Sequence, residues 1–98
     1  MSEIYTYSYI KDMLSKVSEN NKLKWSDFLI VFQYLDIKLK NIEMLKKKKL
    51  LTITNKAIVL EIVNQINKIL SNNLVENDMA SKQIREILTE ITNKVNQL

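Results

Sequence analysis

The stretch that decides the fold is residues 26–43, SDFLIVFQYLDIKLKNIE. Its apolar residues return in alternating steps of four and three, which is the period of an amphipathic helix. Ser26 is the predicted N-cap, and Asp27 follows it in the first turn, where the helix dipole favours an anion. The helix predicted here spans about 26–46 and is expected to be the central one, because apolar residues cover more than half its circumference. The expected seam is Phe28, Phe32, Leu35, Leu39 and Ile42, and the expected polar face is Gln33, Asp36, Lys40 and Glu43.

Three further segments with helical periodicity flank this stretch and predict helices over about 3–18, 55–70 and 79–97. Polar runs at 18–22 and 71–73 separate the helices, and a connector is expected between the second and the third. Asn77 or Asp78 is expected to begin the last helix. The seam of the third helix is Val59, Ile62, Ile66 and Ile69, and that of the fourth is Ile84, Leu88, Ile91, Val95 and Leu98.

The first segment allows a second interpretation. Tyr5, Tyr7 and Tyr9 alternate with Thr6 and Ser8, which is the period of a β-strand. No other run in the chain offers such a strand a partner, so a helix is the preferred prediction. Thr6 or Ser8 would then cap a later start of this helix.

The composition supports the same fold class. The 98 residues contain no glycine and no proline, the residues on which the tight turns of β proteins usually depend. Seams with alternating steps suit helices packed nearly antiparallel through short loops. We therefore predict an all-α protein, a compact bundle of about four antiparallel helices that forms a single domain over residues 1–98.

The residue types that carry most enzyme chemistry are missing. The chain has no histidine and no cysteine, which removes the commonest general base, thiolate metal ligands and disulfides. Phosphate-binding loops of the usual kind need glycine. Glu86 and Glu90 share one helix face, but that face is polar, so they are interpreted as solvated surface carboxylates. We expect no enzyme, and no catalytic, cofactor-binding or metal-binding residue.

The most prominent local feature is the run Lys46, Lys47, Lys48 and Lys49 in a chain of net charge +4. The run could contact a phosphate backbone or an acidic partner. The preferred interpretation is a solvated helix end, where cations offset the helix dipole. With Arg85 as the single arginine, base-specific recognition is not expected. Any binding of nucleic acid would be independent of sequence and sensitive to salt.

Aromatic residues mark a second candidate surface. Trp25 is expected to pack on the first turns of its own helix or to be a hot spot for a partner. Tyr5, Tyr7 and Tyr9 cannot all face one side of a helix, so at least one should be exposed. These four residues form the predicted partner surface.

Neither a membrane-spanning stretch nor a leader is expected from the sequence. The longest purely apolar run is 28–32, and a span needs about 20 such residues. The first residues lack a basic region followed by an apolar one, so no signal peptide is expected. We expect an intracellular protein, in the cytoplasm or, if viral, within a virus particle.

Over residues 23–70 the chain resembles certain short helical proteins of large DNA viruses. The resemblance rests on KWSDF at 24–28, the lysine run at 46–49 and AIVLEIV at 57–63. It implies a viral origin, with a place in a virion or in a host interaction, and it carries over no activity. With the surplus of apolar helix faces, it leads us to expect a non-catalytic protein–protein interaction or assembly module that binds a partner or itself. The alternative is a lysine-rich accessory protein that binds nucleic-acid backbone.

Overall fold

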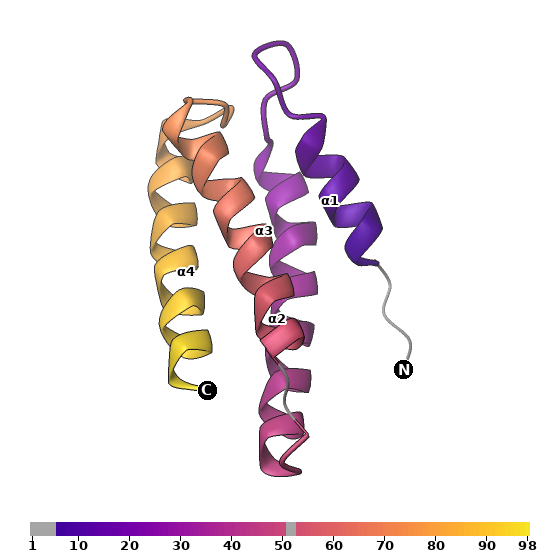
Figure 1. Cartoon of the computed structure of the whole chain (residues 1–98). Coiled ribbons are helices and arrows are strands. Elements are labelled where there is room, and N and C mark those ends of the chain that lie inside the picture. Colours follow the sequence, from indigo (N-terminus) through magenta and orange to yellow (C-terminus); the bar gives the residue numbers. More distant parts are fainter. Residues whose placement is uncertain (1–5, 51–52) are drawn as a thin grey trace.

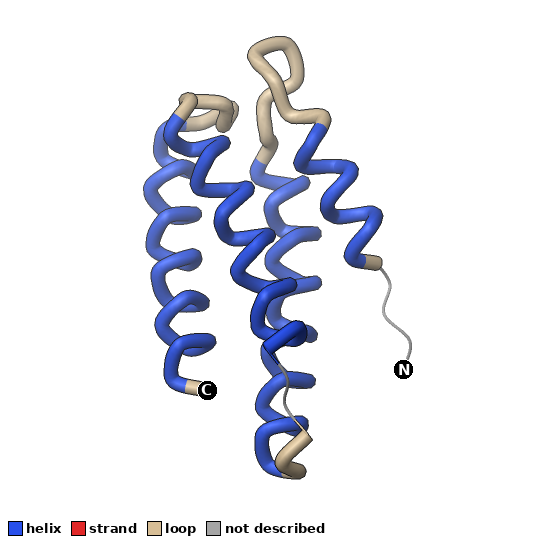
Figure 2. Tube along the Cα trace, in the orientation of Figure 1, coloured by secondary structure: helices blue, strands red, loops and turns tan. Residues whose placement is uncertain are grey.

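A computed structural model describes residues 6–50 and 53–98 of the chain. Its described part consists of four α-helices joined by loops, without a named strand (Figure 2). Consecutive helices run antiparallel (Figure 1). The all-α bundle predicted from the sequence is therefore confirmed, and the bounds of its last three helices agree with the prediction to within two residues. The helices are α1 (Tyr7–Ser15), α2 (Trp25–Lys47), α3 (Ile53–Ser71) and α4 (Asp78–Gln97).

The helix α1 is shorter than the predicted 3–18. It begins after Thr6, whose Oγ1 accepts a hydrogen bond from the Tyr9 amide at 3.1 Å. This N-cap satisfies one of the amides that a helix leaves open at its start. Tyr7 and Tyr9 are helical, so the strand interpretation is wrong for them. Residues 3–5 of the predicted helix, including Tyr5, lie outside the described residues.

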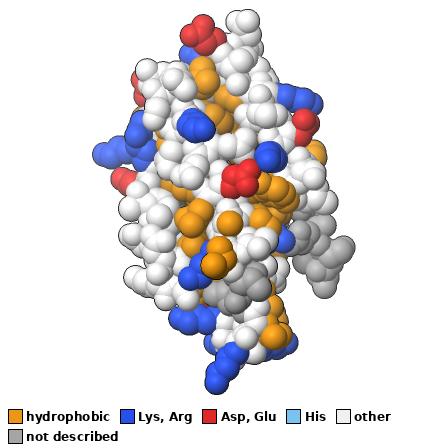
Figure 3. All heavy atoms as spheres, in the orientation of Figure 1, with side chains coloured by type: hydrophobic (Ala, Val, Ile, Leu, Met, Phe, Trp, Pro, Cys, Tyr) orange, Lys and Arg blue, Asp and Glu red, His pale blue; other side chains and the backbone are white. Residues whose placement is uncertain are grey.

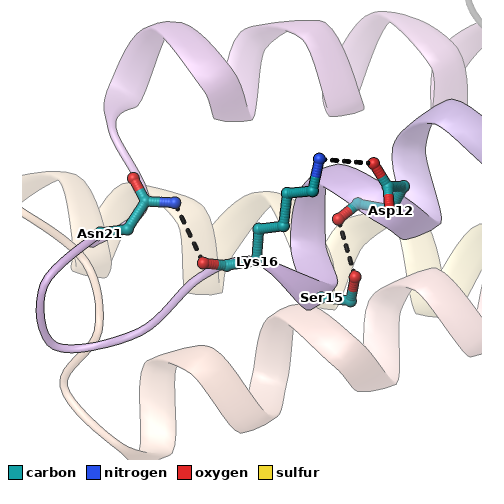
Figure 4. Close-up of polar contacts among 4 residues, drawn as sticks. All are labelled: Asp12, Ser15, Lys16 and Asn21. Carbon is teal, nitrogen blue, oxygen red and sulfur yellow. Dashed lines mark hydrogen bonds and ion pairs between the residues drawn. The ribbon is translucent and has the colours of Figure 1, made fainter.

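Local polar contacts accompany the end of α1 at Ser15 (Figure 4). The Asn21 side-chain amide donates to the Lys16 carbonyl at 3.0 Å, and the Ser15 hydroxyl donates to the Asp12 carbonyl at 2.7 Å. Ser18 and Asn21 then exchange backbone hydrogen bonds of 3.0 Å in both directions. The chain reverses at this turn, so the helix cannot continue to residue 18 as predicted.

The core is organised around α3. This helix packs against α1, α2 and α4, and its packing is closest with α4. In Figure 1 α3 lies between α4 and α1, with α2 behind it. The prediction that the 26–46 helix is the central one is therefore wrong, since α1 packs mainly on α3. The buried side chains of α3 are Val59, Ile62, Val63, Ile66, Ile69 and Leu70.

The buried seam of α2 differs from the predicted one, because Val31 replaces Phe32 and Tyr34 is buried in addition. Leu35 is fully buried as predicted, whereas Phe32 is 36% exposed and Val31 takes its place in the core. Both Val31 and Phe32 lie three or four residues from Phe28 and from Leu35. Periodicity therefore cannot choose between them, although their side chains point about 100° apart around the helix. The buried residues of α2 are Phe28, Val31, Tyr34, Leu35, Leu39 and Ile42.

A backbone bridge ties two loops together at one end of the bundle. The Leu23 amide donates to the Leu74 carbonyl at 2.7 Å, and the Glu76 amide donates to the Leu23 carbonyl at 2.9 Å. Leu23 and Val75 form the bridge and are buried. The bridge fixes the chain just before α2, which begins at Trp25 with Lys24 as a cap that makes no side-chain hydrogen bond. The predicted Ser26 cap is therefore wrong.

Two non-glycine residues make the turns that glycine usually makes at helix ends. Lys49 after α2 (φ 59°) and Asn73 after α3 (φ 55°) adopt left-handed backbone. The Leu50 amide donates to the Leu45 carbonyl and the Lys49 amide to the Lys46 carbonyl, which is the Schellman pattern. Asparagine tolerates this conformation, but lysine pays a steric cost for it.

Replacing Lys49 with glycine should therefore stabilise the protein. We expect the free energy of unfolding to rise by about 0.5–1 kcal/mol. Glycine removes the steric penalty of the left-handed conformation, but it also loses more backbone entropy on folding than lysine does, which offsets part of the gain. Urea melts of Lys49→Gly and of Lys48→Gly make the test, because Lys48 has φ −87° and gains nothing from glycine. A Lys49→Gly variant less stable than the original chain would contradict the left-handed turn.

The corrected seam of α2 predicts different costs for neighbouring truncations. Leu35→Ala should lower the free energy of unfolding by about 2–5 kcal/mol, because it leaves a cavity in the core. Phe32→Ala should lower the free energy of unfolding by much less than the roughly 3–5 kcal/mol that truncation of a buried phenylalanine costs. Gln33→Ala is the control and should stay within about 0.5 kcal/mol. Equal losses for Phe32→Ala and Leu35→Ala in urea melts would restore the seam expected from the sequence.

Candidate interaction surface

Three large apolar side chains are exposed along one face of α2. Trp25 is 37% exposed, Leu29 46% and Phe32 36%. They follow one another at steps of four and three residues, so they lie on the same helix face. We call these three residues the α2 stripe. An apolar row of this kind on a helix surface is typical of a site that another protein covers.

The aromatic rings of the stripe are held by the core. The Phe28 ring is fully buried, and its centroid lies 5.6 Å from that of Trp25 and 6.4 Å from that of Phe32. Trp25 therefore packs on the first turn of its own helix, as one of its two interpretations predicted, and remains partly exposed. Aromatic side chains held in this way lose little further freedom when a partner binds.

Charged residues limit the stripe towards the C-terminal end of α2. Asp36, Lys40 and Glu43 follow Phe32 on nearly the same face. The Lys40 ammonium lies 3.1 Å from the Asp36 carboxylate; the Lys40 side chain is largely exposed and that of Asp36 about half exposed. The apolar part of this face is thus confined to the first three turns of α2, with a charged border beside it.

The tyrosines of the predicted partner surface do not join the stripe. Tyr7 is half-buried and packs against the core, whereas Tyr9 is 48% exposed. Tyr9 lines a hollow of about 200 Å³ between α1 and the start of α2, to which Asp27 also contributes. Asp27 follows Trp25 by two residues and so points to the opposite side of α2. Tyr5 lies outside the described residues.

A surface cluster of Tyr7, Lys11 and Glu61 joins α1 to α3. The Lys11 ammonium lies 3.1 Å from the Glu61 carboxylate and 5.7 Å from the centre of the Tyr7 ring. Hydrogen bonds from Tyr7 and Lys11 lower the pKa of Glu61. The bond to Glu61 raises the pKa of Tyr7 and that of Lys11. Each of these shifts arises from a contact that holds α1 on α3.

The lysine run lies at the end of the bundle away from Trp25. Lys46 and Lys47 form the last turn of α2, and all four lysines of the run are exposed. The Lys46 ammonium donates to the Gln97 carbonyl at the end of α4, at 3.4 Å. The run therefore lies at the end of a helix as expected, and it adjoins the last turn of α4.

The described residues offer no assembled site for metal chemistry. Within 6–50 and 53–98 no group of three histidine, cysteine, aspartate or glutamate side chains is placed to hold a metal ion. Glu86 and Glu90 are both exposed on α4. In the same part of the chain, no helix combines the length and the apolar character needed to cross a membrane.

Comparison with known proteins finds no matching family model, no matching curated protein and no matching solved structure. The geometry of the α2 stripe is therefore the main guide to function. Sequence reasoning found Trp25 but missed Leu29, and it placed Phe32 in the core. The sequence does contain a pattern that indicates this surface, since Trp25, Leu29 and Phe32 repeat with the helical period beside the buried seam of α2.

The cluster of Tyr7, Lys11 and Glu61 makes the stability depend on pH. Because the pKa of Glu61 is lowered on folding, its contribution is present above the ordinary value of 4.5 and is lost as the pH falls below it. The raised pKa values of Tyr7 and Lys11 give a contribution that is present below about 10 and is lost at higher pH.

Urea melts of the original chain and of Glu61→Gln should therefore differ at neutral pH and converge in acid. Glu19→Gln is the control, because Glu19 is an exposed loop residue. A gap between the original chain and Glu61→Gln that stays constant from neutral to acid pH would contradict the proposed contacts.

Proposed function

We propose that this protein is a non-catalytic interaction module that binds a helical segment of a protein partner along the α2 stripe. The observation that carries the proposal is the exposure of Trp25, Leu29 and Phe32 on one helix face. Partner helices are commonly recognised through apolar contacts at this spacing. Tryptophan is also among the residues most enriched in binding hot spots.

The size of the stripe favours a short partner segment. Each of its three side chains is less than half exposed, so together they offer at most a few hundred Å² of apolar surface. A stable interface between two folded proteins buries about 800 Å² on each partner. A single amphipathic helix that lies along α2 fits a stripe of this size better than the broad face of a second domain does.

The charges beside the stripe favour one orientation of the partner. The face becomes charged at Asp36 and Lys40, whose ion pair is exposed. A partner helix that is apolar over two turns and charged beyond them matches this border. The segment could belong to another protein or to a second copy of this chain. The resemblance to helical proteins of DNA viruses would place such a module in a virus particle or on a host protein.

Site-specific photo-crosslinking tests the proposal in the protein's native cell. A photoreactive residue at position 29 should capture a protein partner, whereas the same residue at position 82 on α4 should not. The double substitution Leu29→Gln and Phe32→Gln should weaken binding to that partner at least about tenfold while the bundle stays folded. Met79→Gln is the matched control, because Met79 is 76% exposed and belongs to a different helix, α4.

Sedimentation velocity at rising protein concentration separates the two kinds of partner. Dimers that disappear in the Leu29→Gln and Phe32→Gln variant would identify the partner as a second copy. A strict monomer that also gives no crosslink from position 29 would overturn the proposal.

A further inference from the structure

The positive charge of this protein is concentrated in one segment. Residues 44–60 contain five of the fifteen basic residues and none of the eleven acidic ones. The remaining 81 residues therefore carry ten basic and eleven acidic side chains, which nearly cancel. The net charge of +4 thus arises entirely from the end of α2, the start of α3 and the connection between them.

Exposed apolar side chains lie among these lysines. Met44 is 50% exposed, Leu50 62% and Ile53 87%. Lys46–Lys49 lie between Met44 and Leu50 in the chain, and Ile53 follows three residues after Leu50. Ile53 is the most exposed of the large apolar residues that the structure describes. We call Met44, Lys46–Lys49, Leu50 and Ile53 the basic tip. Leucine and isoleucine this exposed at one end of a molecule contribute little to its own core.

The shape of the molecule makes the basic tip accessible. The bundle measures 44 × 25 × 19 Å, and the end of α2 projects beyond the ends of α1 and α4 (Figure 1). Figure 3 shows lysine and hydrophobic side chains together at this lower end. The start of α3, with Ile53, is set back from the end of α2 in Figure 1, so a flat surface that touches both Leu50 and Ile53 lies obliquely against this end of the bundle.

We propose that the basic tip binds the surface of an anionic lipid bilayer, with Leu50 and Ile53 inserted between the headgroups and the lysines on the lipid phosphates and carboxylates. Clusters of four or more lysines are attracted to anionic membranes. A single apolar anchor is weak, and stable binding needs a second signal such as a basic patch. The basic tip supplies both signals within ten residues, from Met44 to Ile53.

The exposed apolar residues favour a bilayer over a nucleic acid. A phosphate backbone would engage Lys46–Lys49 but would leave Leu50 and Ile53 in water. Proteins that bind single strands stack bases on aromatic side chains, and residues 44–60 contain no aromatic residue. A bilayer is the one polyanion that offers an apolar environment directly beneath its charges.

The proposal is independent of the α2 stripe. Phe32 and Lys47 are fifteen residues apart on one helix, which corresponds to about 22 Å along its axis. A partner helix on the stripe would therefore lie clear of a membrane at the basic tip. If the protein fails to bind membranes, the proposal of a protein partner on the α2 stripe still stands. If no protein partner binds the stripe, the proposal of membrane binding at the basic tip still stands.

Co-sedimentation of the full chain with vesicles tests the proposal. The protein should bind vesicles of equimolar phosphatidylserine and phosphatidylcholine, should not bind pure phosphatidylcholine, and should dissociate as salt is added. The triple variant Lys47→Gln, Lys48→Gln and Lys49→Gln should bind about a hundredfold more weakly, at about fivefold for each lysine. Lys46 is left in place because it contacts Gln97.

Two controls carry the same chemical changes at other exposed positions. Lys22→Gln, Lys24→Gln and Lys82→Gln remove three exposed lysines outside the tip and should leave binding within a few fold. Leu50→Gln with Ile53→Gln should weaken binding by about tenfold or more, whereas Met79→Gln should not change it. Circular dichroism melts verify that each variant is folded.

Three outcomes would overturn the proposal. The first is a failure of the original chain to bind the phosphatidylserine vesicles at low salt. The second is equal loss in the two lysine triples, which would show that total charge rather than the basic tip matters. The third is undiminished vesicle binding by the Leu50→Gln and Ile53→Gln variant together with a lysine-dependent gel shift of duplex DNA, which would indicate a site for nucleic-acid backbone.

Discussion

The packing of α3 against three other helices is the interaction on which the rest of this structure depends. Among the described residues of α1 only the side chains of Ile10 and Leu14 are buried. This is too little apolar surface for a helix of nine residues to be stable alone. The helix α1 is held because it lies on α3, with the contact between Lys11 and Glu61 at the border. The helices α2 and α4 contact each other as well as α3, but a loss of α3 packing would remove most of the packing between the helices.

Backbone hydrogen bonds between loops stabilise the bundle in addition to the burial of side chains. The bridge between Leu23 and Val75 joins the loop before α2 to the loop before α4, and both residues are buried. Buried backbone amides and carbonyls must find partners, and these two loops provide them for each other. Lys49 and Asn73 then end α2 and α3 with left-handed turns. A chain without glycine therefore still makes sharp reversals, with a steric cost concentrated at Lys49.

The same packing explains why α2 carries two different surfaces. Its face beside the seam stays open, which exposes the α2 stripe near its beginning. Its last turn extends past the ends of α1 and α4, which exposes Lys46–Lys49 and Leu50. The two surfaces are separate because they lie towards opposite ends of a single long helix.

Much of the fold was predictable because it depends on local properties of the chain. Helical periodicity located α2, α3 and α4 within two residues, and the missing glycine and proline pointed to an all-α protein. Asn77, one of the two residues expected to begin the last helix, caps α4, since its side chain accepts a hydrogen bond from the Met79 amide. Such features depend on residues within one or two turns of each other. The lysine run and Trp25 were also visible as candidates, because they differ in kind from their neighbours.

The sequence by itself determined which segments are helical and, for α3 and α4, which face is apolar. Only the tertiary structure decided that Val31 rather than Phe32 enters the core, because both positions satisfy the same period and the neighbouring helices select one. It likewise decided that α3 is central and that α1 ends at Ser15, since both depend on contacts between segments far apart in the chain. The α2 stripe emerged from that selection, because an apolar side chain becomes a surface feature only where no other helix covers it.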